Sequence, residues 1–344
     1  MSGTIGRREF LRGSAGAAEM IGGLGATTLP AASRAQAPGA PLPPVAGAMP
    51  WKIDIYTRHL QWTRSPDEIG EGAKRMGFDG VDITVRPFPG HVDPARVKED
   101  LPPFVKAIRS HGVEVHMITC PITDADSPHA EAILDAASNL GIRHYWWDGL
   151  QYAKGQPIMP QLEAMRPRVA GLARLNAKYG MTAMYHTYGG EHTVNDRVFV
   201  SGPMWDILYL LRDHDPREVG IQWDSCHMTN AGGLRTWELN LRAAGPYIRG
   251  ISWKDSLQEK AADGHWFPHY VPLGQGNVEL VRAVAVLREI GFEGPMEIQP
   301  EHIQGAGGEG MPKLEEPKEW VYGLMQADLA TLRAAIRASE SYTL

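Results

Sequence analysis

The chain has 344 residues, of which 43% are hydrophobic and 22% are charged, so it can bury a large core. Its formal net charge is -6 and no run of basic residues stands out, which argues against a nucleic acid partner. No stretch of the sequence approaches the ~20 continuous apolar residues of a membrane-spanning helix. We therefore expect a small neutral or polar ligand.

The first 37 residues carry the features of an export signal in the expected order. Arg7 and Arg8 come first, a mildly apolar Gly/Ala-rich segment follows, and Ala35 and Ala37 have the spacing of an A-x-A cleavage site. This pattern resembles a bacterial twin-arginine signal and predicts a periplasmic mature protein. A chance arginine pair in a disordered N-terminus is the alternative.

A Pro-rich linker is predicted at 38–50, and the domain that follows at 51–340 alternates short strands with helices. Runs of β-branched and aromatic residues predict eight strands, at Lys52–Tyr56, Gly80–Val85, Val113–Ile118, His144–Trp147, Thr182–His186, Val219–Trp223, Gly250–Trp253 and Pro295–Gln299. The first helix has Ser65 as its N-cap, Pro66 in its first turn and Gly77 as its stop.

Eight strands separated by helices, with no reversal, predict an α/β fold with a parallel sheet, and this number of strands closes a single (β/α)8 TIM barrel. A doubly wound open sheet is the alternative. It is disfavoured because no Gly-rich phosphate loop follows the first strand.

The active site of such a barrel lies at the C-terminal ends of its strands. Polar and titratable side chains gather near these predicted ends, and they are Arg86, His91, His116, Asp148, His186, Asp224, His227, Lys254, Glu297, Gln299 and Glu301.

Several motifs resemble one known family. "GFDGVDI", "WDSCH", "SWKD" with "VPLGQGNVEL", and "GFEGPMEIQPEH" are similar to the sugar phosphate isomerase/epimerase family, the xylose isomerase-like TIM barrels, over 51–302. The resemblance implies an enzyme that isomerises, epimerises or eliminates a carbohydrate by removing a proton beside a carbonyl. The alternative from another class is a non-catalytic sugar-binding barrel that has lost its metal. A DNA endonuclease shares the barrel but is disfavoured by the acidic charge and the export signal.

The resemblance also implies one divalent metal, Mn²⁺, Mg²⁺ or Zn²⁺, held by side chains from strands five to eight. The corresponding positions in this sequence are His186, Asp224, Ser252 and Gln299. Serine binds metals poorly, and the carboxylate of Glu301 lies two residues after Gln299. The expected ligands are therefore His186, Asp224, Gln299 and Glu301.

Three residues are assigned to catalysis: His186, Asp224 and Lys254. Substrate contacts are assigned to Arg86, His91, His116, His227 and Trp266. Trp266 lies in "HWFPHY" on the loop after the seventh strand, where an apolar lid over a sugar ring or an ordinary surface loop is expected. Cys226 is assigned to packing, and no disulfide with Cys120 is expected.

The export assignment yields a prediction. Replacing both Arg7 and Arg8 with lysine should leave unprocessed precursor in the cytoplasm, because the arginine pair is what distinguishes this signal. Immunoblots of cell fractions would measure this. Mature protein that begins near Pro38 and reaches the periplasm at the normal level would contradict it.

Overall fold

The computed structural model describes residues 51–189, 191–192, 197–264, 266–303 and 310–343. The predicted export signal at 1–37 and the linker at 38–50 lie outside these residues. Within the described part of the chain, no helix has both the length and the apolar character needed to cross a bilayer.

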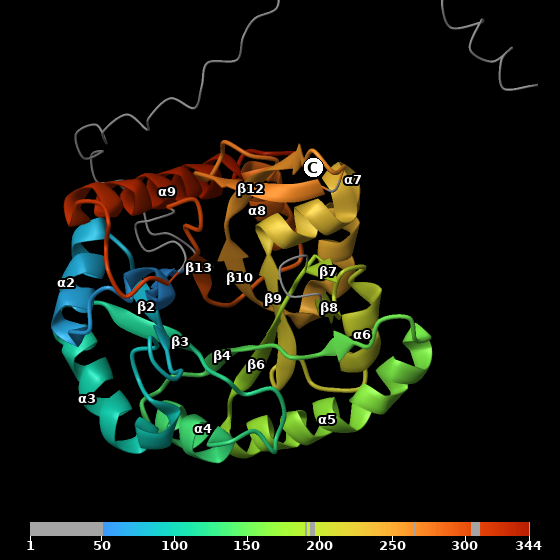
Figure 1. Cartoon of the computed structure of the whole chain (residues 1–344), viewed down its shortest axis with the longest axis horizontal. Helices are drawn as coiled ribbons and strands as arrows, with labels where there is room; N and C mark the ends of the chain where they lie inside the picture. Colours follow the sequence, from blue (N-terminus) through green and yellow to red (C-terminus); the bar gives the residue numbers. More distant parts are fainter. Residues whose placement is uncertain (1–50, 190, 193–196, 265, 304–309, 344) are drawn as a thin grey trace, which may run out of the picture. The chain divides into compact units, whose positions relative to one another are not determined.

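Eight parallel strands close into a barrel, and helices cover its outer surface (Figure 1). In chain order the strands are β1 (Ile53–Tyr56), β2 (Gly80–Thr84), β3 (Glu114–Thr119), β4 (His144–Trp147), β6 (Thr182–His186), β9 (Val219–Asp224), β10 (Ile248–Trp253) and β13 (Met296–Ile298). Each strand hydrogen-bonds to the next in this order, and β13 closes the barrel against β1. The predicted TIM barrel is confirmed, with every strand end within two residues of its expected position.

The connecting helices follow the predicted pattern. They are α2 (Pro66–Met76), α3 (Val97–Ser110), α4 (Ala130–Asn139), α5 (Ile158–Tyr179), α6 (Trp205–Leu211), α7 (Ser225–Ala244), α8 (Leu280–Glu289) and α9 (Lys318–Ala338). The Ser65 hydroxyl caps α2 by accepting a hydrogen bond from the Glu68 amide, and Gly77 ends the helix at a φ of 91°. Short 3₁₀ turns lie at η1 (Thr57–Leu60), η2 (Pro94–Arg96) and η3 (Gly245–Tyr247).

The two faces of the barrel strands differ in character. The face toward the helices belongs to one large apolar core. The interior holds a small cluster of Tyr56, Met117, Trp146 and Met184. It also holds several polar side chains that are at most 3% exposed, namely Asp54, Asp82, Gln222, Ser252, Glu297 and Gln299. Because buried polar groups are costly without partners, this interior indicates a built polar network.

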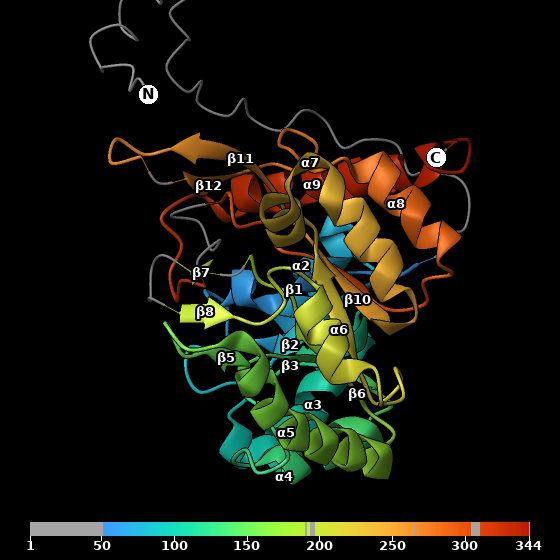
Figure 2. The same ribbon diagram turned by 90° about the vertical axis from the view of Figure 1, so that its right-hand side faces the viewer.

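Two small β structures follow the C-terminal ends of barrel strands, and Figure 2 shows them on the same side of the barrel. One is a sheet of β5 (Gln151–Tyr152), β8 (Arg197–Phe199) and β7 (Glu191–His192). The other is an antiparallel hairpin of β11 (Asp255–Lys260) and β12 (Trp266–Val271), where the sequence predicts only a loop. The two sheets therefore extend the end of the barrel at which the active site is expected.

Candidate active site

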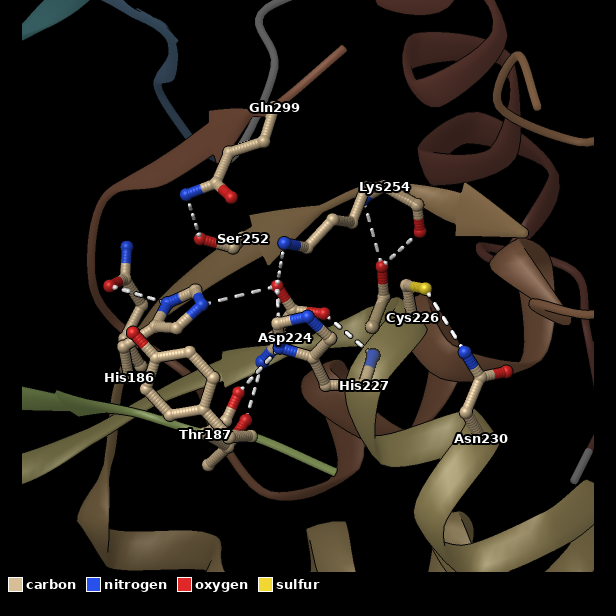
Figure 3. A network of polar contacts seen from close by, with 12 residues as sticks. His186, Thr187, Asp224, Cys226, His227, Asn230, Ser252, Lys254 and Gln299 are labelled. Carbon is tan, nitrogen blue, oxygen red and sulfur yellow. Dashed lines mark hydrogen bonds and ion pairs between the residues drawn. The ribbon is translucent and has the colours of Figure 1, made fainter. Parts of the chain in front are cut away.

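Asp224 lies where β9 ends and α7 begins. Its Oδ1 accepts a hydrogen bond of 2.7 Å from the His227 amide and so caps α7. Its own amide donates to the Thr187 hydroxyl at 2.9 Å. These bonds fix the carboxylate, and they leave Oδ2 facing side chains from the neighbouring strands (Figure 3).

Three side chains surround Asp224 Oδ2, and the oxygen accepts no hydrogen bond. Lys254 Nζ lies 3.0 Å away, His186 Nε2 lies 3.4 Å away and His227 Nδ1 lies 3.6 Å away. Asp224 and His186 are at most 2% exposed, and Lys254 is 4% exposed. The sequence-predicted catalytic residues are thus brought together in one buried cluster.

Lys254 also joins a second carboxylate. Its Nζ lies 3.3 Å from Glu301 Oε1, and Arg58 Nη1 approaches the same oxygen at 3.8 Å. Burial alone would lower the pKa of Lys254, but Asp224 and Glu301 outweigh it and raise the pKa well above its usual value. Burial likewise opposes ionisation of Glu301, yet Lys254 and the other nearby cations lower its pKa to about 2. An ammonium between two carboxylates is therefore present at neutral pH.

A chain of hydrogen bonds fixes the tautomer of His186. His186 Nδ1 lies 3.2 Å from Gln222 Oε1, and Gln222 Nε2 donates to Glu297 Oε1 at 2.8 Å. Because the amide oxygen only accepts, Nδ1 must carry the hydrogen and Nε2 keeps its lone pair toward Asp224. Burial also lowers the pKa of His186 well below its usual value, with the Lys254 charge adding to the effect.

Glu297 is the centre of the interior network. Its Oε1 also accepts from the Ser252 hydroxyl at 2.5 Å and from Gln299 Nε2 at 2.6 Å. The Asp82 carboxyl group lies beside it, and burial together with this neighbouring acid raises the pKa of Asp82 well above its usual value. Burial raises the pKa of Glu297 as well.

Three of these residues fit a divalent cation. His186, Asp224 and His227 each offer one ligand atom, and these atoms lie within 4.8 Å of one another. Asp224 Oδ2, which is ion-paired with Lys254, and the lone pair of His186 Nε2 face each other as two acceptors, and a cation between them would contact both. Two imidazoles and one carboxylate with an open fourth position are typical of catalytic zinc.

The other two predicted ligands lie outside this group. Gln299 donates both to Glu297 and to the Ser252 hydroxyl, the second bond being 3.1 Å long. Glu301 is paired with Lys254 and Arg58. His227, which the sequence assigns to substrate contact, takes the third position in the cluster instead. The amide nitrogen of Gln299 is thus engaged by the Glu297 network, and the Glu301 carboxylate is engaged by two cations.

A family model described as the xylose isomerase-like TIM barrel matches residues 71–324. The chain belongs to this family. A search of curated protein sequences found no match.

Solved structures of similar fold include sugar epimerases. D-psicose 3-epimerase from Clostridium cellulolyticum H10 aligns with a TM-score of 0.61 at 16% identity, covering 83% of this chain and 99% of that chain. The 3-keto-D-glucoside 4-epimerase YcjR from E. coli aligns with a TM-score of 0.58 at 15% identity, covering 83% and 99%. The IOLI protein with a bound zinc atom aligns with a TM-score of 0.57 at 13% identity, covering 85% and 100%. At such low identities these likenesses show the shared fold.

In this xylose isomerase-like barrel, Arg86 lies beside the cluster. Its guanidinium carbon lies 4.4 Å from the centre of the Trp146 ring, and that ring is 4.8 Å from the His186 ring. Tyr188 lies on another side of His186, with its ring 5.0 Å away, and it stacks on His227 at 5.5 Å. The site thus combines charged groups with aromatic faces. Trp146 and Tyr188 are contacts that sequence reasoning missed.

His91 is not brought to the cluster. Its Nδ1 is 2.7 Å from the Thr84 hydroxyl and its Nε2 is 3.1 Å from the Thr63 carbonyl. Both ring nitrogens therefore hold the loop after β2 in place.

His116 faces the opposite end of the barrel. It is the third residue of β3, and it lines a hollow of about 630 Å³ with residues that precede the strands. Its Nδ1 pairs with Asp54 Oδ1 at 2.7 Å. Gly80 makes this pair possible, because a Cβ there would lie 2.4 Å from Asp54 Oδ1 and 2.5 Å from His116 Nδ1. The structure therefore does not bring His116, which the sequence assigns to substrate contact, to the cluster, because the residue lies early in its strand.

Cys226 and Trp266 follow the C-terminal ends of barrel strands and lie outside the metal group. Cys226 is buried and unpaired, as is Cys120. Burial raises the pKa of the Cys226 thiol to about 12, as expected of a packing residue. Trp266 lies on the hairpin and is 61% exposed, so it does not cover the cluster.

Gln222, Glu297 and Asp82 are the functional neighbours that the sequence analysis did not assign. Each is a polar residue with an apolar neighbour on both sides in its strand, and Gln222 and Glu297 lie two positions before Asp224 and Gln299. Since alternate residues of a strand share a face, this spacing was the signal that could have found them.

The Gln222 contact predicts an effect on metal binding. Gln222→Leu should weaken Zn²⁺ binding about tenfold or more, because His186 would lose the partner that fixes its tautomer. Competition with a chromophoric chelator would measure it. Ser252→Ala is the matched control, since Ser252 also donates to Glu297 and does not contact His186. An equal loss of Zn²⁺ affinity in both variants would contradict the role assigned to the contact between Gln222 and His186.

The burial of His91 predicts a pH dependence of stability. Burial, with the Arg64 charge, lowers its pKa from 6.5 to about 4. Between these values the unfolded chain binds a proton that the folded chain does not, so the free energy of unfolding should fall as the pH drops from about 6.5 to about 4. Urea unfolding across this range should show a smaller fall for His91→Gln than for the wild type. An equal fall in the free energy of unfolding for the two proteins would contradict this prediction.

Proposed function

We propose that the protein is a carbohydrate isomerase, epimerase or lyase that removes a proton beside a carbonyl. The observation that carries this proposal is the buried ammonium of Lys254 between Asp224 and Glu301, next to two imidazoles at the C-terminal end of the barrel. The similar solved structures that are sugar epimerases support the same reaction type.

His186, Asp224 and His227 would hold a divalent metal, and Zn²⁺ suits two imidazoles and a carboxylate. When bound, the metal would polarise the carbonyl oxygen of the substrate. His186 is prepared for this role because the Gln222 contact leaves its Nε2 lone pair free.

Lys254 supplies a positive charge. Because Asp224 and Glu301 raise its pKa above the usual value, we assign it the role of a cation and not that of the base. Its ammonium instead stabilises the negative oxygen that forms when the neighbouring carbon loses its proton.

Glu301 is the carboxylate that accepts the proton. It is ionised at neutral pH and lies outside the three-residue metal group. Its low pKa depends on Lys254, so movement of the ammonium toward the substrate oxygen raises the basicity of Glu301 at the step that needs it.

A small carbohydrate is the proposed substrate. Trp146 and Tyr188 flank His186 at ring distances of 4.8 and 5.0 Å, so the site has an aromatic lining of the kind that sugar sites use. We further propose that the reaction takes place in the periplasm, on the strength of the predicted export signal. The epimerase structures give no support to a non-catalytic sugar-binding barrel.

A screen of keto-sugars and oxidised glycosides, together with metal analysis of the purified protein, tests this function. Asp224→Asn should lose bound metal and reduce turnover at least about a hundredfold, because it removes the charge that metal and Lys254 share. Cys226→Ala, two residues away, is the control and should keep both. Retained metal and turnover in Asp224→Asn would overturn the proposal, as would tight sugar binding without turnover in the metal-loaded wild type.

A further inference from the structure

The hairpin of β11 and β12 continues directly from the strand that carries Lys254. Alternate residues of the hairpin share a face, and the register pairs Ser256 with Tyr270, Gln258 with Pro268 and Lys260 with Trp266. These six residues form one surface, which we call the even face.

The inner end of the even face belongs to the site. The Lys254 ammonium lies 5.9 Å from the centre of the Tyr270 ring. The Ser256 hydroxyl contacts Cys226 Sγ at 3.1 Å and Asn230 Nδ2 at 3.1 Å, which packs this end against the start of α7. The even face therefore begins where the proposed chemistry takes place.

The outer end of the even face is open. Exposure increases outward along both strands, from buried Ser256 to exposed Lys260 and from half-buried Tyr270 to exposed Trp266. Trp266 is 61% exposed, and the Lys260 ammonium lies 5.8 Å from its ring centre. Figure 2 shows the hairpin extending beyond the body of the barrel. A large aromatic ring is thus held by β structure and left accessible.

The composition of this open end fits a sugar. A sugar ring has an apolar face of C–H groups and a polar edge of hydroxyls, and the even face offers the rings of Trp266 and Pro268 beside the amide of Gln258 and the ammonium of Lys260. Trp266 and Tyr270 are four residues apart, which is about 13 Å along a strand. That separation exceeds one sugar ring, so a molecule that reaches both must have more than one unit.

We propose that the even face is a subsite for the outer sugar unit of a disaccharide or other glycoside, whose inner unit occupies the site beside Lys254. This inference rests on the proposed function for the identity of the site, and it narrows the substrate class from small carbohydrates in general to glycosides. The even face is continuous with the site, since β11 follows directly from Lys254.

Binding to the full chain, measured by saturation-transfer NMR and calorimetry, tests the subsite. The probes are maltose, cellobiose and lactose against glucose, galactose and fructose. Trp266→Ala should weaken binding of at least one disaccharide about tenfold and leave monosaccharide binding unchanged. Leu257→Ala is the matched control, because Leu257 is 39% exposed on the opposite face of the same hairpin and should change neither.

Three results would overturn the subsite. They are equal losses for disaccharides and monosaccharides in Trp266→Ala, no binding of any disaccharide by the wild type, and a change of oligomeric state in Trp266→Ala by light scattering, which would assign the face to a second copy of the chain. Binding is measured without turnover and can be repeated in Asp224→Asn. A failed subsite and a failed isomerase assignment therefore give different results.

Discussion

A single buried carboxylate, Glu297, organises the interior of this barrel. One of its oxygens accepts hydrogen bonds from Gln222, Ser252 and Gln299, and the carboxyl group of Asp82 lies beside it. A charge at this depth is tolerated only with such a set of donors, because an unpaired ion in a protein interior costs several kcal/mol. Gln222 and Ser252 lie on different strands and Gln299 directly follows a third, so these strands must be in the correct register for all three hydrogen bonds to form.

The Glu297 network also determines how side chains of the candidate site are oriented. Gln222 donates a hydrogen bond to Glu297 through its amide nitrogen, so the amide oxygen of Gln222 faces His186. His186 therefore carries its hydrogen on Nδ1 and keeps a lone pair on Nε2. Ser252 and Gln299 donate hydrogen bonds to the same carboxylate. The interior network thus orients His186, which forms the candidate metal group with Asp224 and His227.

The mouth and the hairpin are joined in the same way. Asp255, directly after Lys254, accepts hydrogen bonds from the backbone amides of Gly274, Gly276 and Val278. These bonds tie the segment after β12 back to the point where β11 leaves the barrel. The ammonium of Lys254 and the even face therefore share one rigid anchor, which suits a site that must align a reacting group with a distant ring.

The sequence by itself determined the barrel, because apolar strands and capped helices alternate eight times and each element is recognisable locally. It also determined the cluster of His186, Asp224 and Lys254, since parallel strands bring their C-terminal ends together. Only the tertiary structure decided which partners Gln299, Glu301 and His116 contact. Each side chain takes its role from partners on other strands, through buried hydrogen bonds and charges whose geometry no local pattern encodes.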